Sequence, residues 1–137
     1  GMLLAGAALP SSYYLTALRW RQQIANLMRA TFNDNRLDAL ATPTVPAFAQ
    51  LHDQQEFVYP GGEEPVISSF VRTTAPFNLT GQPALSVPCG FTADGLPLGL
   101  QIAGRPFAED MVLRIGAAYE SATDWVAHLP PLHVANQ

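Results

Sequence analysis

Two strand-forming stretches, residues 83–90 and 98–103, flank the dipeptide Asp94-Gly95. Asp-Gly between two apolar stretches is a strong signal for a tight turn, so the pair predicts a β-hairpin. In the second stretch the even-numbered positions share one face and the odd-numbered positions share the other, as in a pleated strand. Pro88 cannot donate a backbone hydrogen bond and therefore belongs near a strand end or on a sheet edge. A sheet containing this hairpin is the first expectation for the fold.

Residues 12–33 predict an amphipathic helix, because apolar side chains recur there at steps of three, four and seven positions. Its apolar stripe comprises Tyr14, Leu18, Ala25, Met28 and Phe32. Ser11 or Ser12 is the expected N-cap, and residues 33–35, Asn-Asp-Asn, are expected to end the helix.

A second long helix is expected to begin at Glu109 and Asp110, where negative charge suits the helix dipole. Its apolar stripe comprises Val112, Ile115, Ala118, Tyr119, Ala122 and Trp125. Leu-Pro-Pro at 129–131 is expected to end it, because proline cannot continue a helix.

Three weaker elements are expected between these helices. Residues 37–41 read as a buried strand, and 56–59 read as a short edge strand inside the loop-rich segment 44–65. Residues 67–79 read as helical at first, and Pro76 is expected to interrupt the helix or to start a turn. The order predicts an α/β fold with a mixed sheet and flanking helices.

We expect three parts in the chain. Residues 1–10 form an N-terminal segment, residues 11–132 form the domain, and residues 133–137 form a tail. Gly1 reads as a remnant of tag removal, and the segment that follows lacks the basic region of a signal peptide.

Composition excludes several classes of partner. All seven basic residues are scattered arginines and the net charge is −4, so a nucleic-acid partner is not expected. No apolar run approaches the roughly 20 residues of a membrane helix. Charged residues make up only 13% of the chain. This low content fits either a surface covered by another protein or a compact enzyme fragment of low charge.

The single cysteine, Cys89, rules out an internal disulfide framework. A lone cysteine favours a cytoplasmic protein, because that compartment keeps thiols reduced. Cys89 lies in an apolar stretch without a basic neighbour, so a buried, inert thiol is expected.

The sequence carries no recognisable nucleophile motif. No serine sits in G-x-S-x-G. Ser68 and Ser69 lack flanking glycines and read as a helix start or loop, while Ser86 reads as a core or ladder residue of a strand.

Metal and cofactor signals are also weak. His52, His128 and His133 do not have convincing zinc spacing. The pair Glu63 and Glu64 reads as solvated, and the glycines do not form a phosphate-binding pattern. No metal or cofactor is therefore expected.

Residues 77–88 read Phe-Asn-Leu-Thr-Gly-Gln-Pro-Ala-Leu-Ser-Val-Pro, and 94–106 read Asp-Gly-Leu-Pro-Leu-Gly-Leu-Gln-Ile-Ala-Gly-Arg-Pro. This pattern resembles the C-terminal part of amidase-signature enzymes, including bacterial amidases and the A subunits of aspartyl/glutamyl-tRNA amidotransferases. Stretches 14–19, 37–44 and 120–125 resemble the same family, so about residues 11–132 match.

The resemblance implies an amidase-like hydrolase of carboxamide C–N bonds that uses a Ser–Ser–Lys triad. In the family the lysine and a Gly/Ser-rich serine segment precede this part, and this chain contains no lysine. No catalytic residue is therefore assigned here, and the chain is expected to be inactive alone. The alternative is an interaction module that completes a split amidase or amidotransferase with a separate polypeptide.

The resemblance also implies one wall of a substrate pocket, around Thr73, Thr74, Asn78 and Gly81. The A subunits of amidotransferases carry an acidic residue just before this turn, whereas residues 70–72 here are Phe-Val-Arg. That difference favours a general amidase as the parent. Without the rest of the fold, apolar surface would remain uncovered, so a homodimer or a partner chain is expected, through helix 12–33 or a sheet edge.

Overall fold

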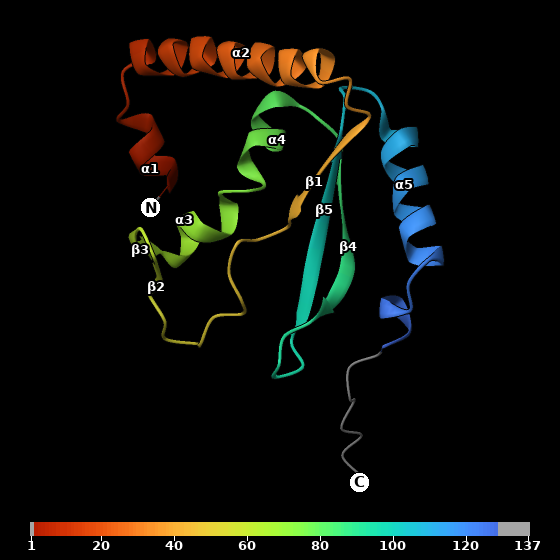
Figure 1. Ribbon diagram of the computed structural model, residues 1–137. Coiled ribbons are helices and arrows are strands. Elements are labelled where there is room, and N and C mark those ends of the chain that lie inside the picture. The colour runs from red at the N-terminus through yellow and green to blue at the C-terminus, as the bar shows by residue number, and fades with distance from the viewer. Residues whose placement is uncertain (1, 129–137) are drawn as a thin grey trace, which may run out of the picture.

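The computed structural model describes residues 2–128 (Figure 1). Its centre is a three-stranded sheet in the order β1-β5-β4, formed by β1 (Ala39–Pro43), β4 (Ala84–Phe91) and β5 (Pro97–Gly104). Both pairings are antiparallel, and β4 and β5 form the hairpin expected around Asp94-Gly95. The α/β fold class with helices flanking a sheet is confirmed, but every strand pairing within residues 2–128 is antiparallel, whereas a mixed sheet was expected.

The prolines of the sheet lie where a ladder tolerates them, on the two outer strands and, as Pro97, at the first residue of the central strand. Pro43 ends β1, and Pro88 lies on β4 opposite Gly99 of the central strand. The register shifts between Pro88 and Gly90, so Cys89 is the extra residue of a β-bulge. The expectation that Pro88 belongs on an edge is confirmed.

The first strand begins two residues later than the predicted 37–41. Arg36 adopts a positive φ of 52°, and the amide of Leu37 donates to the carbonyl of Phe32 at 2.8 Å. Leu37 therefore belongs to the turn that closes the preceding helix. The strand proper, β1, is partly exposed rather than buried, because it lies on the edge of the sheet.

Helix α5 (Glu109–Ser121) covers one face of the sheet by packing on β4 and β5 (Figure 1). Val87, Ile102 and Val112 form the buried cluster between them. The helix ends earlier than predicted, with Ala122 as its C-cap, and the expected stop at 129–131 lies outside the described residues. The chain then turns back as the short 3-10 helix η1 (Trp125–Ala127), whose tryptophan ring packs edge-on against Phe91.

The other long helix, α2 (Ser11–Asp34), confirms the predicted helix to within one residue at each end. Its N-cap is Pro10, with no side-chain cap, so the predicted serine cap is wrong. The extended conformation of Pro10 already directs the chain into the helix, and its carbonyl accepts from the amide of Tyr13. Residues Met2–Ala7 form a further helix, α1.

Two short helices, α3 (Val66–Val71) and α4 (Ala75–Thr80), lie on the side of the sheet opposite α5 (Figure 1). The helical stretch is interrupted, as expected, but Pro76 sits in the first turn of a second helix, α4, and not in a turn. The Nε of Arg21 donates to the carbonyl of Leu79 at 2.6 Å and joins α2 to the C-terminal end of α4.

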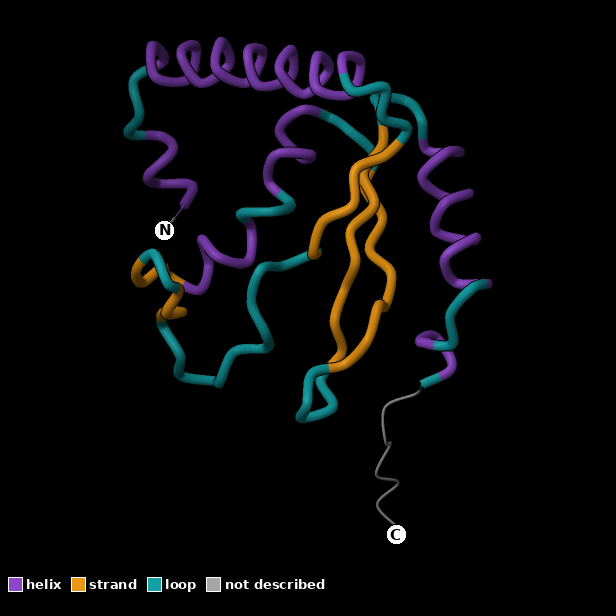
Figure 2. Tube along the Cα trace, in the orientation of Figure 1, coloured by secondary structure: helices purple, strands orange, loops and turns teal. Residues whose placement is uncertain are grey.

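The loop-rich segment contains a complete second hairpin, β2 (Glu56–Tyr59) and β3 (Gly62–Pro65) (Figure 2). The edge strand at 56–59 is confirmed, while β3 was not anticipated. Its sequence, Gly-Glu-Glu-Pro, has no strand-forming side chain, and only pairing with β2 makes it a strand.

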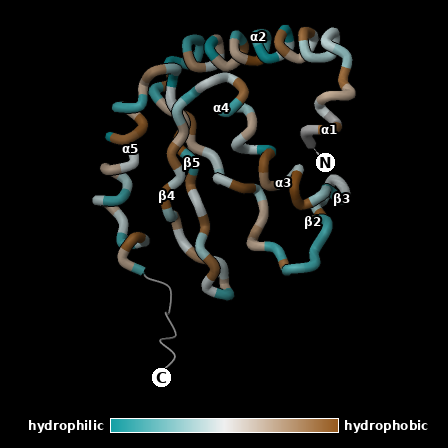
Figure 3. Tube along the Cα trace, turned by 180° about the vertical axis from the view of Figure 1, so that it is seen from behind, coloured by the Kyte–Doolittle hydropathy of each residue, from teal (hydrophilic) through white to brown (hydrophobic). Residues whose placement is uncertain are grey.

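Helix α2 leaves much apolar surface in solvent. Hydrophobic and hydrophilic residues are interspersed along it (Figure 3). Only Phe32 of the helix is buried. The exposed large apolar side chains of α1, α2 and their junction are Leu4, Leu9, Tyr13, Tyr14, Leu15, Leu18, Trp20 and Leu27. No helix within residues 2–128 is long and apolar enough to cross a membrane.

Candidate functional site

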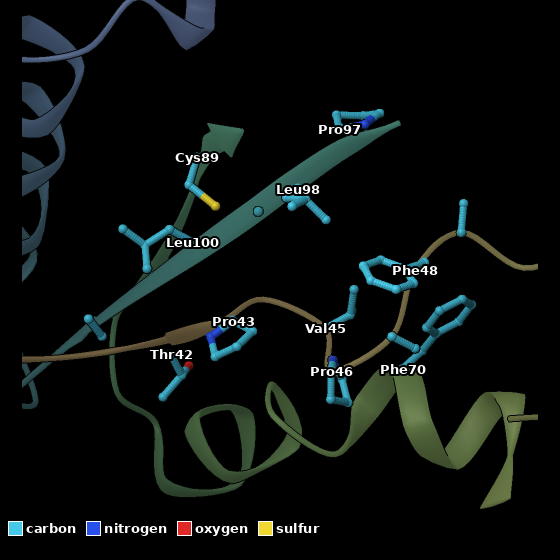
Figure 4. A pocket seen from close by; sticks show the side chains of 14 residues that line it. Thr42, Pro43, Val45, Pro46, Phe48, Phe70, Cys89, Pro97, Leu98 and Leu100 are labelled. Atoms are coloured by element: carbon cyan, nitrogen blue, oxygen red, sulfur yellow. The ribbon is translucent and has the colours of Figure 1, made fainter. Parts of the chain in front are cut away.

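An apolar pocket of about 900 Å³ opens where the end of β1, the loop after it, helix α3 and the β4–β5 hairpin meet (Figure 4). It is lined by Ala41, Thr42, Pro43, Val45, Pro46, Ala47, Phe48, Ala49, Phe70, Cys89, Pro97, Leu98, Gly99 and Leu100. The lining contains no acidic or basic residue and no histidine. The volume falls in the range of small-molecule sites, roughly 300–1,000 Å³.

Each wall of the pocket has a local cause in the sequence. Pro43 and Pro46 restrict the backbone where the chain leaves the sheet. The bulge places Cys89 outside the regular ladder of β4, where it is partly exposed beside Leu98 and Leu100 (Figure 4). The expectation of a buried thiol is therefore wrong, because the bulge, which the sequence pattern did not indicate, brings Cys89 to the pocket.

Thr44 holds the loop that forms the mouth of the pocket. Its amide donates to the carbonyl of Gly99 at 2.9 Å, and its hydroxyl lies 2.6 Å from the hydroxyl of Ser86. Its carbonyl accepts from the hydroxyl of Thr73 at 2.6 Å. The side chain of Ser86, expected as a core or ladder residue, thus serves as a ladder residue that anchors this loop.

Gln101 completes this polar layer behind the pocket. The amide nitrogen of its buried side chain donates to the hydroxyl of Thr42 and to the carbonyl of Thr73, both at 3.0 Å. The two bonds tie the central strand to the edge strand and to the turn between α3 and α4. A buried amide that satisfies both neighbours fixes their relative positions.

The four residues expected as a pocket wall lie along the α3–α4 turn and α4. Thr73 contacts the loop at Thr44, as described, and Thr74 is the N-cap residue of α4. Asn78 is exposed on α4, and Gly81 is its C-cap with a left-handed φ of 74°. None of the four lines the apolar pocket. Their role as a wall toward other parts of an amidase fold stays a prediction.

The serines do not form a nucleophile–base pair within residues 2–128. Ser69 is fully buried in α3 and its hydroxyl contacts the phenol of Tyr59, while Ser68 is exposed on the same helix. The hydroxyl of Ser86 pairs with that of Thr44, and the hydroxyl of Ser121 donates to a helix carbonyl. Both Ser68 and Ser69 lie in α3, which agrees with their interpretation as structural residues at a helix start rather than as nucleophiles.

The histidines and acidic residues are dispersed. The ring of His128 lies close to that of Trp125, and its Nδ1 lies 3.0 Å from the carbonyl of Asp124. His52 is exposed, and His133 lies outside the described residues. Within the described part of the chain, no three potential metal ligands converge.

Glu64 corrects one expectation, since it is half-buried rather than solvated. One of its carboxylate oxygens lies 3.3 Å from a guanidinium nitrogen of Arg72, and the Arg72 guanidinium lies over the ring of Tyr59, 5.0 Å from its centroid. The cause is the packing of the β2–β3 hairpin against α3, which also brings Phe57 edge-on to Phe70. The hairpin therefore supports Phe70, one of the two phenylalanines that line the pocket.

The sequence matches the profile of the family described as Amidase over residues 2–113. Among curated proteins, it is 42% identical to the A subunits of the glutamyl-tRNA(Gln) amidotransferases of Chloroflexus aggregans and Myxococcus xanthus. Each match covers 96% of this chain but 26% of the relative. The chain thus spans about a quarter of the length of the curated relatives it matches.

Solved structures give the same result. The structure described as an amidase superposes with a TM-score of 0.81 at 30% identity, and the match covers 88% of this chain and 27% of that amidase. The A subunit of the Thermotoga maritima glutamyl-tRNA(Gln) amidotransferase superposes with a TM-score of 0.67 at 30% identity. This match covers 90% of this chain and 25% of the Thermotoga subunit. A bacterial aryl acylamidase of the amidase-signature family superposes with a TM-score of 0.71 at 29% identity. The match covers 90% of this chain and 25% of the acylamidase.

Proposed function

This chain belongs to the amidase family, and from that premise we propose that it is the C-terminal portion of an amidase-like hydrolase of carboxamide C–N bonds. In this proposal it contributes pocket walls and sheet to the enzyme but not the catalytic Ser–Ser–Lys residues. The observation that carries the proposal is a family match over residues 2–113 in a chain that has no lysine.

The placement of the serines supports inactivity of the chain by itself. An activated serine needs a base within hydrogen-bonding reach. The buried hydroxyl of Ser69 contacts a tyrosine, and that of Ser86 contacts a threonine. Neither a tyrosine nor a threonine hydroxyl is the adjacent general base that activates a serine nucleophile.

The direct test is ammonia release by the purified chain from a panel of aliphatic and aromatic carboxamides. We expect no release above buffer. Turnover that persists through repurification and disappears on changing a single serine to alanine would overturn the proposal of inactivity.

A complementation experiment tests the positive half of the proposal. The chain is co-expressed with the remaining three-quarters of the amidase that superposes with it, which would supply the lysine and the serine segment. We expect the two pieces to co-purify and to hydrolyse amides, whereas neither does so alone. The same host piece with its lysine changed to alanine is the matched control and should co-purify without activity.

The exposed apolar surface of α1 and α2 favours a second candidate, an interaction module. In that case the chain completes an amidase or amidotransferase formed with a separate polypeptide, or self-associates. Trp20 and Leu27 are each more than 60% exposed although they are large and apolar, and contiguous exposed apolar surface usually marks an interface. Sedimentation at micromolar concentration tests self-association. A dilution-stable monomer that binds no apolar dye would contradict it.

The single thiol favours the reducing cytoplasm as the setting.

A further inference from the structure

We propose that the pocket beside Cys89 binds the apolar group of an electrically neutral ligand, with aromatic or branched aliphatic carboxamides as the ligand class. The pocket itself determines that the ligand is neutral and apolar. The choice of a carboxamide rests on the proposed function. Binding is a property of this chain alone and does not require hydrolysis.

The lining selects against charge. Only Thr42 and Cys89 offer polar side-chain atoms, and the Thr42 hydroxyl already accepts the hydrogen bond from Gln101. A carboxylate or ammonium group entering the pocket would leave water without gaining an opposite charge, which is strongly unfavourable. A zwitterionic amino-acid amide such as free glutamine therefore does not fit this site.

The lining also favours a ring or a branched chain. Phe48 and Phe70 stand on the loop and helix side, and Leu98 and Leu100 stand on the strand side (Figure 4). Phe48 is 65% exposed, so a ligand between the two sides would cover apolar surface that now contacts water. Aromatic rings gain further from edge or offset contacts with phenylalanine.

Two walls of the pocket are anchored before any ligand binds, at Thr44 and at Phe70. Thr44 fixes the mouth loop through Gly99, Ser86 and Thr73, and the β2–β3 hairpin supports Phe70 from behind. A pocket that does not have to be ordered on binding loses less affinity to conformational entropy.

Cys89 provides a direct measurement, because it is the only thiol in the chain and lines the pocket. The rate of its alkylation by a maleimide is measured on the full chain with increasing benzamide or acetanilide. Benzoate and glutamine are the charged comparisons. At a ligand concentration ten times Kd, an occupied pocket should slow alkylation about tenfold, by mass action. We expect saturable protection by the neutral amides and none by the charged compounds.

A matched pair of variants ties the protection to the pocket. Phe48→Asp places a charge at the mouth and should raise the apparent Kd roughly tenfold or more. Phe107→Asp changes a phenylalanine that is 93% exposed and outside the lining, and should leave the Kd unchanged. Ligand-observed saturation-transfer NMR on the same proteins reports binding without using the thiol.

Three results would overturn the proposal: neither thiol protection nor saturation transfer with the neutral amides, equal protection by benzoate, or equal weakening by the two variants. Ammonia release does not enter this test. The proposed amidase function can therefore fail while the pocket binds, and the pocket can fail to bind while complementation succeeds.

Discussion

The guanidinium of Arg105 lies over the ring of Phe32, 5.8 Å from its centroid, and one of its terminal nitrogens donates to the Phe32 carbonyl at 3.0 Å. Its Nε donates to the carbonyl of Leu37 at 3.1 Å, and its other nitrogen donates to the side chain of Asn33. One residue after the central strand thus closes the C-terminal end of α2. Helix α2, in which only Phe32 is buried, is attached to the end of the central strand here.

Replacing Arg105 should therefore loosen α2 from the sheet. Arg105→Ala removes three hydrogen bonds and the contact with Phe32, and we expect a loss of about 2–3 kcal/mol in the free energy of unfolding. Arg105→Lys should recover less than half of this, because lysine lacks the planar fork. Urea titration measures both. Arg114→Ala, which breaks an exposed pair with Asp110, is the control and should change stability by about 0.5 kcal/mol or less.

The buried side chain of Gln101 should also contribute to the free energy of unfolding. Gln101→Met keeps the volume but leaves the carbonyl of Thr73 and the hydroxyl of Thr42 without their donor, at a cost of roughly 1–3 kcal/mol. Gln22→Met on the exposed face of α2 should be near neutral. Equal unfolding midpoints for the two variants would show that the buried amide does not tie the turn to the sheet.

Gly99 should not accept a side chain. A Cβ there would lie 2.8 Å from the Thr44 hydroxyl and 3.0 Å from that of Ser86, two groups that are bonded to each other. We expect Gly99→Ala to cost about 1–3 kcal/mol by overpacking and to weaken ligand protection of Cys89. Gly61→Ala has no atom within 4 Å of the added group and is the matched control. Thermal unfolding of both variants measures the effect, and equal unfolding midpoints for Gly99→Ala and Gly61→Ala would contradict the prediction.

The exposed surface of α2 should control association. Trp20→Glu or Leu27→Glu places a charge on the apolar side chains that the fold leaves uncovered, and should shift sedimentation toward the monomer and reduce dye binding. Leu113→Glu, on the exposed side of α5, carries the same change away from α2 and serves as the comparison. If Leu113→Glu alone dissociates the assembly, the interface lies on α5 instead.

Local sequence patterns determined the elements that depend on short-range effects. The Asp94-Gly95 turn indicated the β4–β5 hairpin, the apolar period located α2 to within one residue at each end, and Pro76 indicated a break in the helical stretch that becomes α3 and α4. Backbone restrictions and hydrophobic periodicity act over a few residues, so they can be read without knowing what the elements pack against.

Tertiary contacts decided the rest. The strand β3 exists only through its pairing with β2, Glu64 is half-buried only because that hairpin packs on α3, and α5 ends early where Trp125 turns back to Phe91. The apolar pocket depends on a bulge that moves Cys89 out of register and on Thr44 bonding to residues 29 and 42 positions away. The bonds of Thr44 join parts of the chain that are distant in sequence, and the other contacts depend on which surfaces of neighbouring elements meet, so hydrophobic periodicity and turn residues did not indicate them.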